Sequence, residues 1–92
     1  MIASIQHKGL KQLWTKGNGS KLPPDQVEKI KLILVLLHAA ETVNDMNFPG
    51  SALHPLKGSL RNYWAVTVKA NWRIIFQFEN GNAHLVDYLD YH

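Results

Sequence analysis

Alternation of apolar and polar residues over the last third of the chain constrains the fold more than any other feature. It runs through residues 63–69 and 72–79, which are joined by a short turn at Ala70–Asn71. Asn80–Gly81 then predicts a tight hairpin, and residues 83–89 supply a third strand. Because side chains alternate across a strand, one set faces the core. The expected core face carries Trp64, Val66, Val68, Trp72, Ile74, Phe76 and Phe78.

Helical spacing precedes this β region. Apolar residues recur every three or four positions over residues 9–16, and a longer helical pattern covers residues 25–41. Residues 2–6 predict a short strand. Residues 44–55 contain two prolines and a glycine and therefore predict a loop.

These elements predict a single α+β domain over residues 1–92. It is a small antiparallel sheet, a C-terminal three-stranded meander plus a short N-terminal strand, with two N-terminal helices packed on one face. The opposite face is partly open and carries Lys69 and Arg73. The 25–41 helix is apolar on most sides, so we expect the first helix and the sheet to cover it. An exposed site for a partner is the alternative.

Composition excludes several classes of protein. The chain has no cysteine, which rules out a disulfide scaffold, a zinc ribbon and a thiol nucleophile. Its longest apolar run, Leu32–Leu37, is far too short to span a bilayer, and the N-terminus has no apolar signal core. We therefore expect no membrane association and a cytoplasmic location. The five histidines lack paired metal-ligand spacing, so no metal site is expected.

Basic residues are segregated along the chain, although the net charge is only +3. Residues 1–24 and 54–73 contain no acid, and the acids are confined to residues 25–45 and 79–90. Such segregation is typical of a surface that binds a polyanion, although lysines also decorate any soluble surface. The residues predicted to form such a nucleic-acid-binding surface are Lys8, Lys16, Lys21, Arg61, Lys69 and Asn71.

Three polar clusters could carry chemistry. They are His54–Gly58, Asn71–Arg73 and Asp90–His92, and each alone is a weak indicator. The chain has no nucleophile elbow, phosphate-binding loop or dinucleotide fingerprint.

Together these clusters carry a family resemblance. The segments "LHPLKG" at 53–58, "YWAVTVKANWRIIFQFENGNA" at 63–83 and the ending "DYLDYH" resemble the HigB toxins of the RelE/ParE superfamily, and the opening "MIASIQHKGLKQLW" also fits. The resemblance implies a RelE-like fold and a ribosome-dependent endonuclease of messenger RNA that uses neither metal nor cofactor. It implies three partners: a helix-turn-helix, HigA-like antitoxin, the ribosomal A site and the messenger. Operator DNA would be reached only through the antitoxin.

By position, the resemblance assigns active-site roles to His54, Lys57, Arg73, Asp90, Tyr91 and His92. Attack of a 2′-hydroxyl on the adjacent phosphate needs a base, an acid and cations that hold the charged intermediate. Imidazole, guanidinium and ammonium groups supply these functions. His92 is expected to act as acid or charge stabiliser, with His54 or Asp90 as base. We expect these groups to meet on the helix-free side of the sheet.

Three alternatives stay open at this point. A ParE-like toxin would poison DNA gyrase and cleave no RNA, although the terminal Asp-Tyr-His sequence argues for a nuclease. A small basic domain could bind RNA or a partner without turnover. The polar residues could also be purely structural, which is least plausible for Tyr91 and His92.

Overall fold

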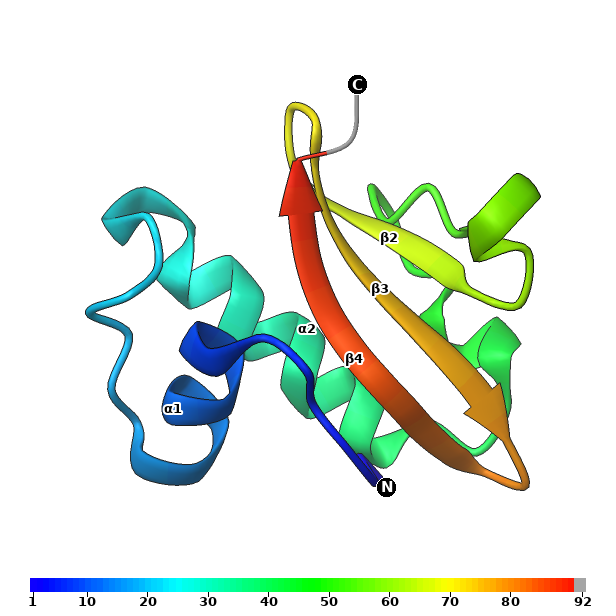
Figure 1. Cartoon of the computed structure of the whole chain (residues 1–92), viewed down its shortest axis with the longest axis horizontal. Coiled ribbons are helices and arrows are strands. Elements are labelled where there is room, and N and C mark those ends of the chain that lie inside the picture. The colour runs from blue at the N-terminus through cyan, green and yellow to red at the C-terminus, as the bar shows by residue number, and fades with distance from the viewer. Residues whose placement is uncertain (91–92) are drawn as a thin grey trace.

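The computed structural model describes residues 1–90. Two α-helices lie on one side of a four-stranded antiparallel sheet with strand order β1-β2-β3-β4, which confirms the expected fold class (Figure 1). The elements in chain order are α1 (Lys8–Lys16), η1 (Pro24–Gln26), α2 (Val27–Ala39), η2 (Val43–Met46), β1 (His54–Pro55), η3 (Gly58–Leu60), β2 (Trp64–Lys69), β3 (Trp72–Glu79) and β4 (Asn82–Asp90).

The β3–β4 hairpin closes where the sequence predicts it. Glu79 pairs with Asn82, and the two turn residues, Asn80 and Gly81, have φ of 54° and 78°. Positive φ at both positions matches the right-handed twist of the strands, and asparagine and glycine tolerate it. The alternation therefore continues from β3 into β4 with a fixed register.

One hydrophobic core lies between the helices and the sheet. From the sheet it receives Val66, Ile74 and Phe76, all fully buried. The helices close it with Leu10, Leu13, Ile30, Ile33, Leu34 and Leu37. This is the core face that the alternation predicts. Burial of these side chains supplies most of the free energy that orders such a short chain.

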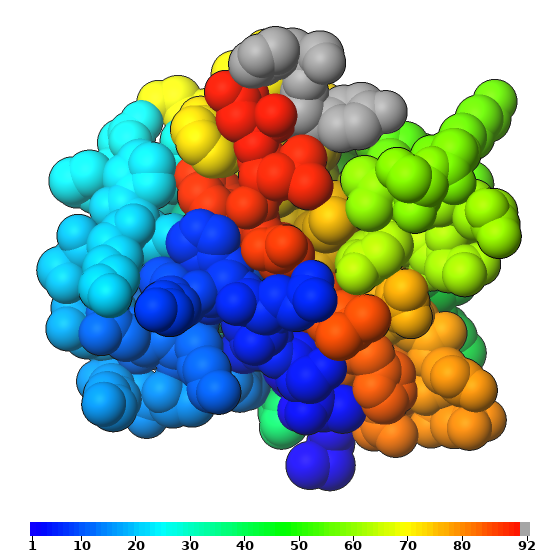
Figure 2. Space-filling view, in the orientation of Figure 1, coloured from blue at the N-terminus to red at the C-terminus, as the bar shows by residue number. Residues whose placement is uncertain are grey.

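Two segments differ from the expectation. Residues 2–6 form only two isolated parallel bridges beside β4, Ile2 to Ala83 and Ile5 to Val86, instead of a strand. The N–H of Ile2 donates instead to Nδ1 of His38 at 3.2 Å. The expected 44–55 loop ends in a short strand, β1, that pairs with β2. In Figure 2 the N-terminal segment runs along β4, on the side away from residues 53–63.

A bulge in β4 reverses which side chains face the core. Ile75 pairs with Asp87 but Gln77 pairs with His84, so β4 holds one extra residue. Leu85 lies in the bulge and has a φ of 53°, which is strained for leucine. Its N–H donates to the Ser4 hydroxyl at 2.8 Å. Beyond the bulge the side chains change sides, which places Tyr88 in the helix-side core.

Helix α2 is covered by α1 and the sheet over most of its surface, as expected, but two large apolar side chains face outward. Leu32 and Val35 are 51% and 54% exposed. Within residues 1–90, no helix is long and apolar enough to cross a bilayer.

Candidate active site

The helix-free face of the sheet brings His54 and Arg73 together. His54 of β1 pairs with Ala65 of β2, which pairs with Ile75 of β3, so these three side chains form one row. Arg73 lies two residues from Ile75 on the same face. Strand spacing and rise per residue then separate the Cα atoms of His54 and Arg73 by about 12 Å. Both side chains therefore project from the same face of the sheet.

A small apolar cluster forms the floor between these two residues. Leu56, Ala65 and Ile75 are buried there. The partly buried side chains that pack against them are Leu60, Tyr63 and Leu89. In Figure 2, atoms of β3 are visible between the end of β4 and the segment around η3. The face therefore has an apolar floor between His54 and Arg73.

Arg73 is fixed by the β2–β3 turn. Its Nη1 donates to the carbonyl oxygens of Ala70 at 2.5 Å and of Trp72 at 3.2 Å. Ala70 has φ of 51°, which is unfavourable for alanine, so this contact also holds the turn. Nε is buried and has no hydrogen-bond partner among residues 1–90. Arg73 is therefore held in place, and none of residues 1–90 accepts a hydrogen bond from its Nε.

The His54 ring is oriented by its own loop. Its Nδ1 lies 2.8 Å from the carbonyl oxygen of Ala52. Because a carbonyl oxygen only accepts, Nδ1 carries the proton, and the neutral ring keeps its lone pair on Nε2. Lys57 and Arg61 are exposed at the two ends of η3, close along the chain to β1. This side of the site is therefore cationic and carries a nitrogen that can take a proton.

Asp90 does not lie on the face that the sequence predicts. It pairs with Trp72, whose ring stacks on Tyr88 at 4.8 Å between centroids, so register puts Asp90 on the helix side of the sheet. The β4 bulge causes the change of side. β4 ends at Asp90, and the end of β4 lies next to the β2–β3 turn (Figure 1). The predicted Tyr91 and His92 lie outside the described residues.

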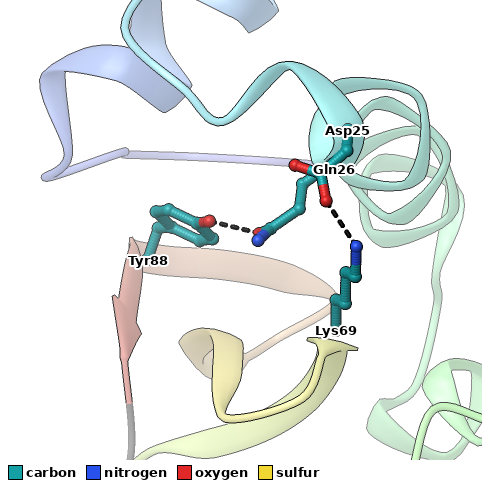
Figure 3. Close-up of polar contacts among 4 residues, drawn as sticks. All are labelled: Asp25, Gln26, Lys69 and Tyr88. Atoms are coloured by element: carbon teal, nitrogen blue, oxygen red, sulfur yellow. Dashed lines mark hydrogen bonds and ion pairs between the residues drawn. The ribbon is translucent and has the colours of Figure 1, made fainter.

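Tyr88 anchors the end of β4 to η1. Its hydroxyl donates to Oε1 of Gln26, and both side chains are buried (Figure 3). Burial, followed by the negative charges of Asp25 and Asp90, raises the pKa of Tyr88 to about 12. Tyr88 is therefore neutral at physiological pH. Its hydrogen bond to Gln26 holds the end of β4, which carries Asp90, against η1.

Lys69 also lies on the helix side, not on the open face that the strand alternation predicts. Its ammonium group forms an ion pair with Asp25 of η1 (Figure 3). A register shift between Thr67 and Lys69 turns the side chain across the sheet. The hydrogen bond from Lys69 holds the pKa of Asp25 below its usual range. Since both groups are more than half exposed, the pair contributes little stability. Asn71 lies in the adjoining turn.

The raised pKa of Tyr88 predicts a stability change at high pH. The folded state holds the phenol proton more tightly than the unfolded chain, whose tyrosine pKa is about 10. The stabilisation is therefore complete below pH 10 and is lost as pH rises toward 12. Urea unfolding between pH 9 and 12 should show a steeper fall in unfolding free energy for the wild type than for Tyr88→Phe. Equal slopes would contradict the assignment.

The N-terminal lysines gather on one side of α1. A pocket of about 240 Å³ is lined by Lys8, Lys11, Lys16 and Lys21 together with Gln12 and Thr15. No acid lies within residues 1–24. Within residues 1–90, no three His, Asp or Glu side chains are grouped so that they could hold a metal ion.

Comparison with known proteins identifies the family. Residues 3–92 match the family described as "RelE-like toxin of type II toxin-antitoxin system HigB". The chain belongs to the HigB-like toxins. It is 47% identical to Endoribonuclease HigB of Proteus vulgaris over 92 residues, covering 100% of both chains. It is 31% identical to Toxin HigB-1 of Vibrio cholerae serotype O1 over 94 residues, covering 100% of this chain and 98% of that protein.

The HigB-like fold also has solved structural neighbours. A crystal structure of YafQ from E. coli strain BL21(DE3) superposes with a TM-score of 0.61 and 18% identity, covering 92% of this chain and 89% of that chain. A crystal structure of a YafQ point mutant from E. coli gives a TM-score of 0.57 and 21% identity with the same coverage. These likenesses concern the fold. As a toxin of a type II toxin–antitoxin system, this HigB-like chain has an antitoxin as its partner.

Two residues that support the site, Tyr88 and Gln26, are not singled out by the sequence. Tyr88 is expected only as a residue of the third strand, and Gln26 carries no signal of its own. Together they form the buried contact that fixes the end of β4 against η1. Only the bulged register puts Tyr88 opposite Gln26, and no local sequence pattern reports that register.

Proposed function

We propose that this HigB-like toxin is an endoribonuclease that cleaves messenger RNA on the translating ribosome by acid–base attack of a 2′-hydroxyl on the adjacent phosphate. Identity of 47% with Endoribonuclease HigB over both full chains supports the endoribonuclease class. The observation that carries the mechanism is the juxtaposition of His54 and Arg73 on the helix-free face, about 12 Å apart by strand geometry.

Each group has a defined task in this mechanism. Nε2 of His54 takes the proton of the 2′-hydroxyl, whose oxygen attacks phosphorus while the bond to the 5′ oxygen breaks. Arg73 and Lys57 stabilise the added negative charge on the phosphate oxygens. The leaving 5′ oxygen takes a proton from the C-terminal residues, for which His92 is the acid in this scheme. The products are a 2′,3′-cyclic phosphate and a 5′-hydroxyl end.

The shallow face explains the ribosome dependence in this proposal. The apolar floor at Ala65 and Ile75 cannot enclose a flexible RNA strand. A decoding site that already holds the messenger bent would supply the orientation, which is worth about 7–11 kcal/mol of barrier in the best cases. Contacts between the basic surface and ribosomal phosphates would hold the toxin there without reading sequence.

The lysines of the pocket beside α1 are expected to set the salt dependence of ribosome binding. Replacing Lys8, Lys16 and Lys21 by alanine removes three of the cations that line one pocket. Because each phosphate contact releases condensed counterions, affinity falls with salt and the slope should flatten by about 2–3 in the triple variant. Sedimentation of the toxin with ribosomes between low and high salt measures this slope. Wild-type binding that barely changes with salt would contradict the prediction.

A translation assay and a DNA supercoiling assay together distinguish a nuclease from a toxin that poisons gyrase. In a reconstituted translation reaction, the toxin should cut a translated reporter and leave intact the same RNA without a start codon. Supercoiling by purified DNA gyrase should be unchanged. An intact reporter together with inhibited gyrase would favour the ParE-like alternative. Binding to ribosomes without cleavage of any translated message would favour a non-catalytic binding domain.

A further inference from the structure

A carboxylate lies on the same face of the sheet as His54 and Arg73. Asp87 of β4 pairs with Ile75 of β3, and so extends the row that joins Ile75 to Ala65 and His54. Because paired residues of an antiparallel sheet point to the same side, Asp87 and His54 lie at the two ends of one row. Three strand spacings separate their Cα atoms by about 14 Å. Asp87 therefore belongs to the face that carries the proposed nuclease groups, although the sequence does not single it out.

The Asp87 carboxylate is held in place, but no cation of residues 1–90 neutralises it. Its Oδ1 accepts a hydrogen bond from the backbone N–H of Tyr88 at 2.9 Å, and the side chain is half-buried. The nearest cation by register is Arg73, whose partner Leu89 lies two residues from Asp87. Arg73 directs its Nη1 to the carbonyl oxygens of the β2–β3 turn instead. A face that is proposed to bind a polyanion therefore keeps one negative charge, on β4.

The distribution of charge across this face orients a bound RNA strand. β1 and β4 are the two outer strands of the sheet. Lys57 and Arg61 are exposed at the two ends of η3, which follows β1 in the chain, whereas Asp87 lies on β4. Phosphates are attracted to the cations and repelled by the carboxylate. An RNA strand on this face therefore lies with its sugar–phosphate backbone toward β1 and with a base toward Asp87.

The hydrogen-bond donors of the four bases decide which base suits Asp87. An ionised carboxylate only accepts hydrogen bonds, and single-stranded RNA presents the Watson–Crick edges of its bases. Guanine places two neighbouring donors on that edge, its N1–H and its N2 amino group. Adenine and cytosine place one donor beside an acceptor, and uracil places one donor between two acceptors. Oδ1 of Asp87 keeps a second lone pair beside its bond to Tyr88, so the two oxygens can accept both guanine donors.

We infer that Asp87 selects guanosine as the nucleotide whose 2′-hydroxyl attacks the scissile phosphate. The inference rests on the proposed nuclease mechanism, in which Nε2 of His54 takes the proton of that hydroxyl. The row is long enough to hold one nucleoside, with its ribose at His54 and its base at Asp87. Leu89 lies on the same face and is partly buried in the apolar floor, where it offers an apolar surface to the flat side of the base. Asp87 is thus a specificity residue, and it takes no part in the proton transfers.

Single-turnover cleavage of matched messengers on ribosomes tests this inference. The messengers differ only in the nucleotide 5′ to the cleavage site, which is guanosine, adenosine, cytidine, uridine or inosine. The wild type should cleave after guanosine at least about 10-fold faster than after the other natural nucleotides. Inosine lacks the N2 amino group and should lose most of this advantage. Asp87→Asn keeps an oxygen for the Tyr88 N–H but replaces the other by a donor, so the preference for guanosine should disappear.

Glu79→Gln is the matched control, because it removes a carboxylate from an exposed position of the same face and should keep the guanosine preference. Equal cleavage after all four natural nucleotides, or a preference that persists in Asp87→Asn, would overturn the inference and leave the nuclease mechanism standing. A rate that Asp87→Asn lowers equally for every nucleotide would also overturn it. If Asp87→Asn melts below the wild type, the comparison of guanosine with inosine on the wild type decides. Absence of cleavage after every nucleotide would instead remove the nuclease proposal, and the inference with it.

Discussion

Replacing Arg73 by alanine is expected to lower the single-turnover rate of messenger cleavage on the ribosome by about 10²–10³-fold, the usual loss when one stabilising donor is removed from a developing anion. Its Nη1 is held by the carbonyl oxygens of Ala70 and Trp72, and its buried Nε has no partner among residues 1–90. The guanidinium group is therefore already oriented before RNA arrives.

Two controls separate catalysis from folding in this experiment. Gln77→Ala changes a half-buried residue of the same strand and face, further from the turn, and should cleave at nearly the wild-type rate. Arg73→Lys keeps the charge but loses the fork of donors, so it should recover only part of the activity. If Arg73→Ala cleaves normally while its urea midpoint falls, Arg73 serves the β2–β3 turn alone and the proposed role is wrong.

Replacing Phe76 by alanine is expected to remove a large part of the unfolding free energy of the protein. Phe76 is fully buried at the centre of β3, and its loss should cost about 3–5 kcal/mol. At roughly 0.05–0.15 kcal/mol per residue, a chain of 92 residues has a total stability of about 5–14 kcal/mol. Urea unfolding followed by circular dichroism measures the loss, and growth arrest on expression should weaken with it.

Phe78 provides the matched comparison. It lies on the same strand and the same face but is only partly buried, with its ring edge-on to Phe76 at 6.5 Å. Phe78→Ala should therefore shift the urea midpoint much less. Equal losses of stability at the two positions would mean that the core between α2 and the sheet is not centred on β3.

The alternation of β2 and β3 and the Asn80–Gly81 turn were predictable because they are local. Period-two patterning decides which side chains are buried, and Asn-Gly selects one hairpin turn. Positions such as Phe76 and Ile75 therefore lie on the faces that the sequence predicts. The helices were equally accessible, because their apolar spacing and the glycine after α1 are local features.

The rest of the site depends on irregularities that local patterns do not report. Leucine rarely adopts positive φ, so nothing at Leu85 predicts the bulge that moves Asp90 to the helix side. A second shift sends Lys69 across to Asp25. The pairing of His54 with Ala65 joins segments separated by a loop, and it depends on tertiary packing. The sequence therefore predicts the class of the fold. For the site, it predicts only which types of residue take part.

The nature of the RNA ends tests the central claim most directly. A synthetic messenger is loaded on ribosomes, with the nucleotide 5′ to the cleavage site present either as ribose or as 2′-deoxyribose. The account predicts a 2′,3′-cyclic phosphate and a 5′-hydroxyl end from the ribose substrate, no cleavage of the deoxy substrate, and a rate that falls sharply with His54→Ala. Cleavage of the deoxy substrate, or product with a 5′-phosphate, would contradict it, since the nucleophile would then not be the 2′-hydroxyl.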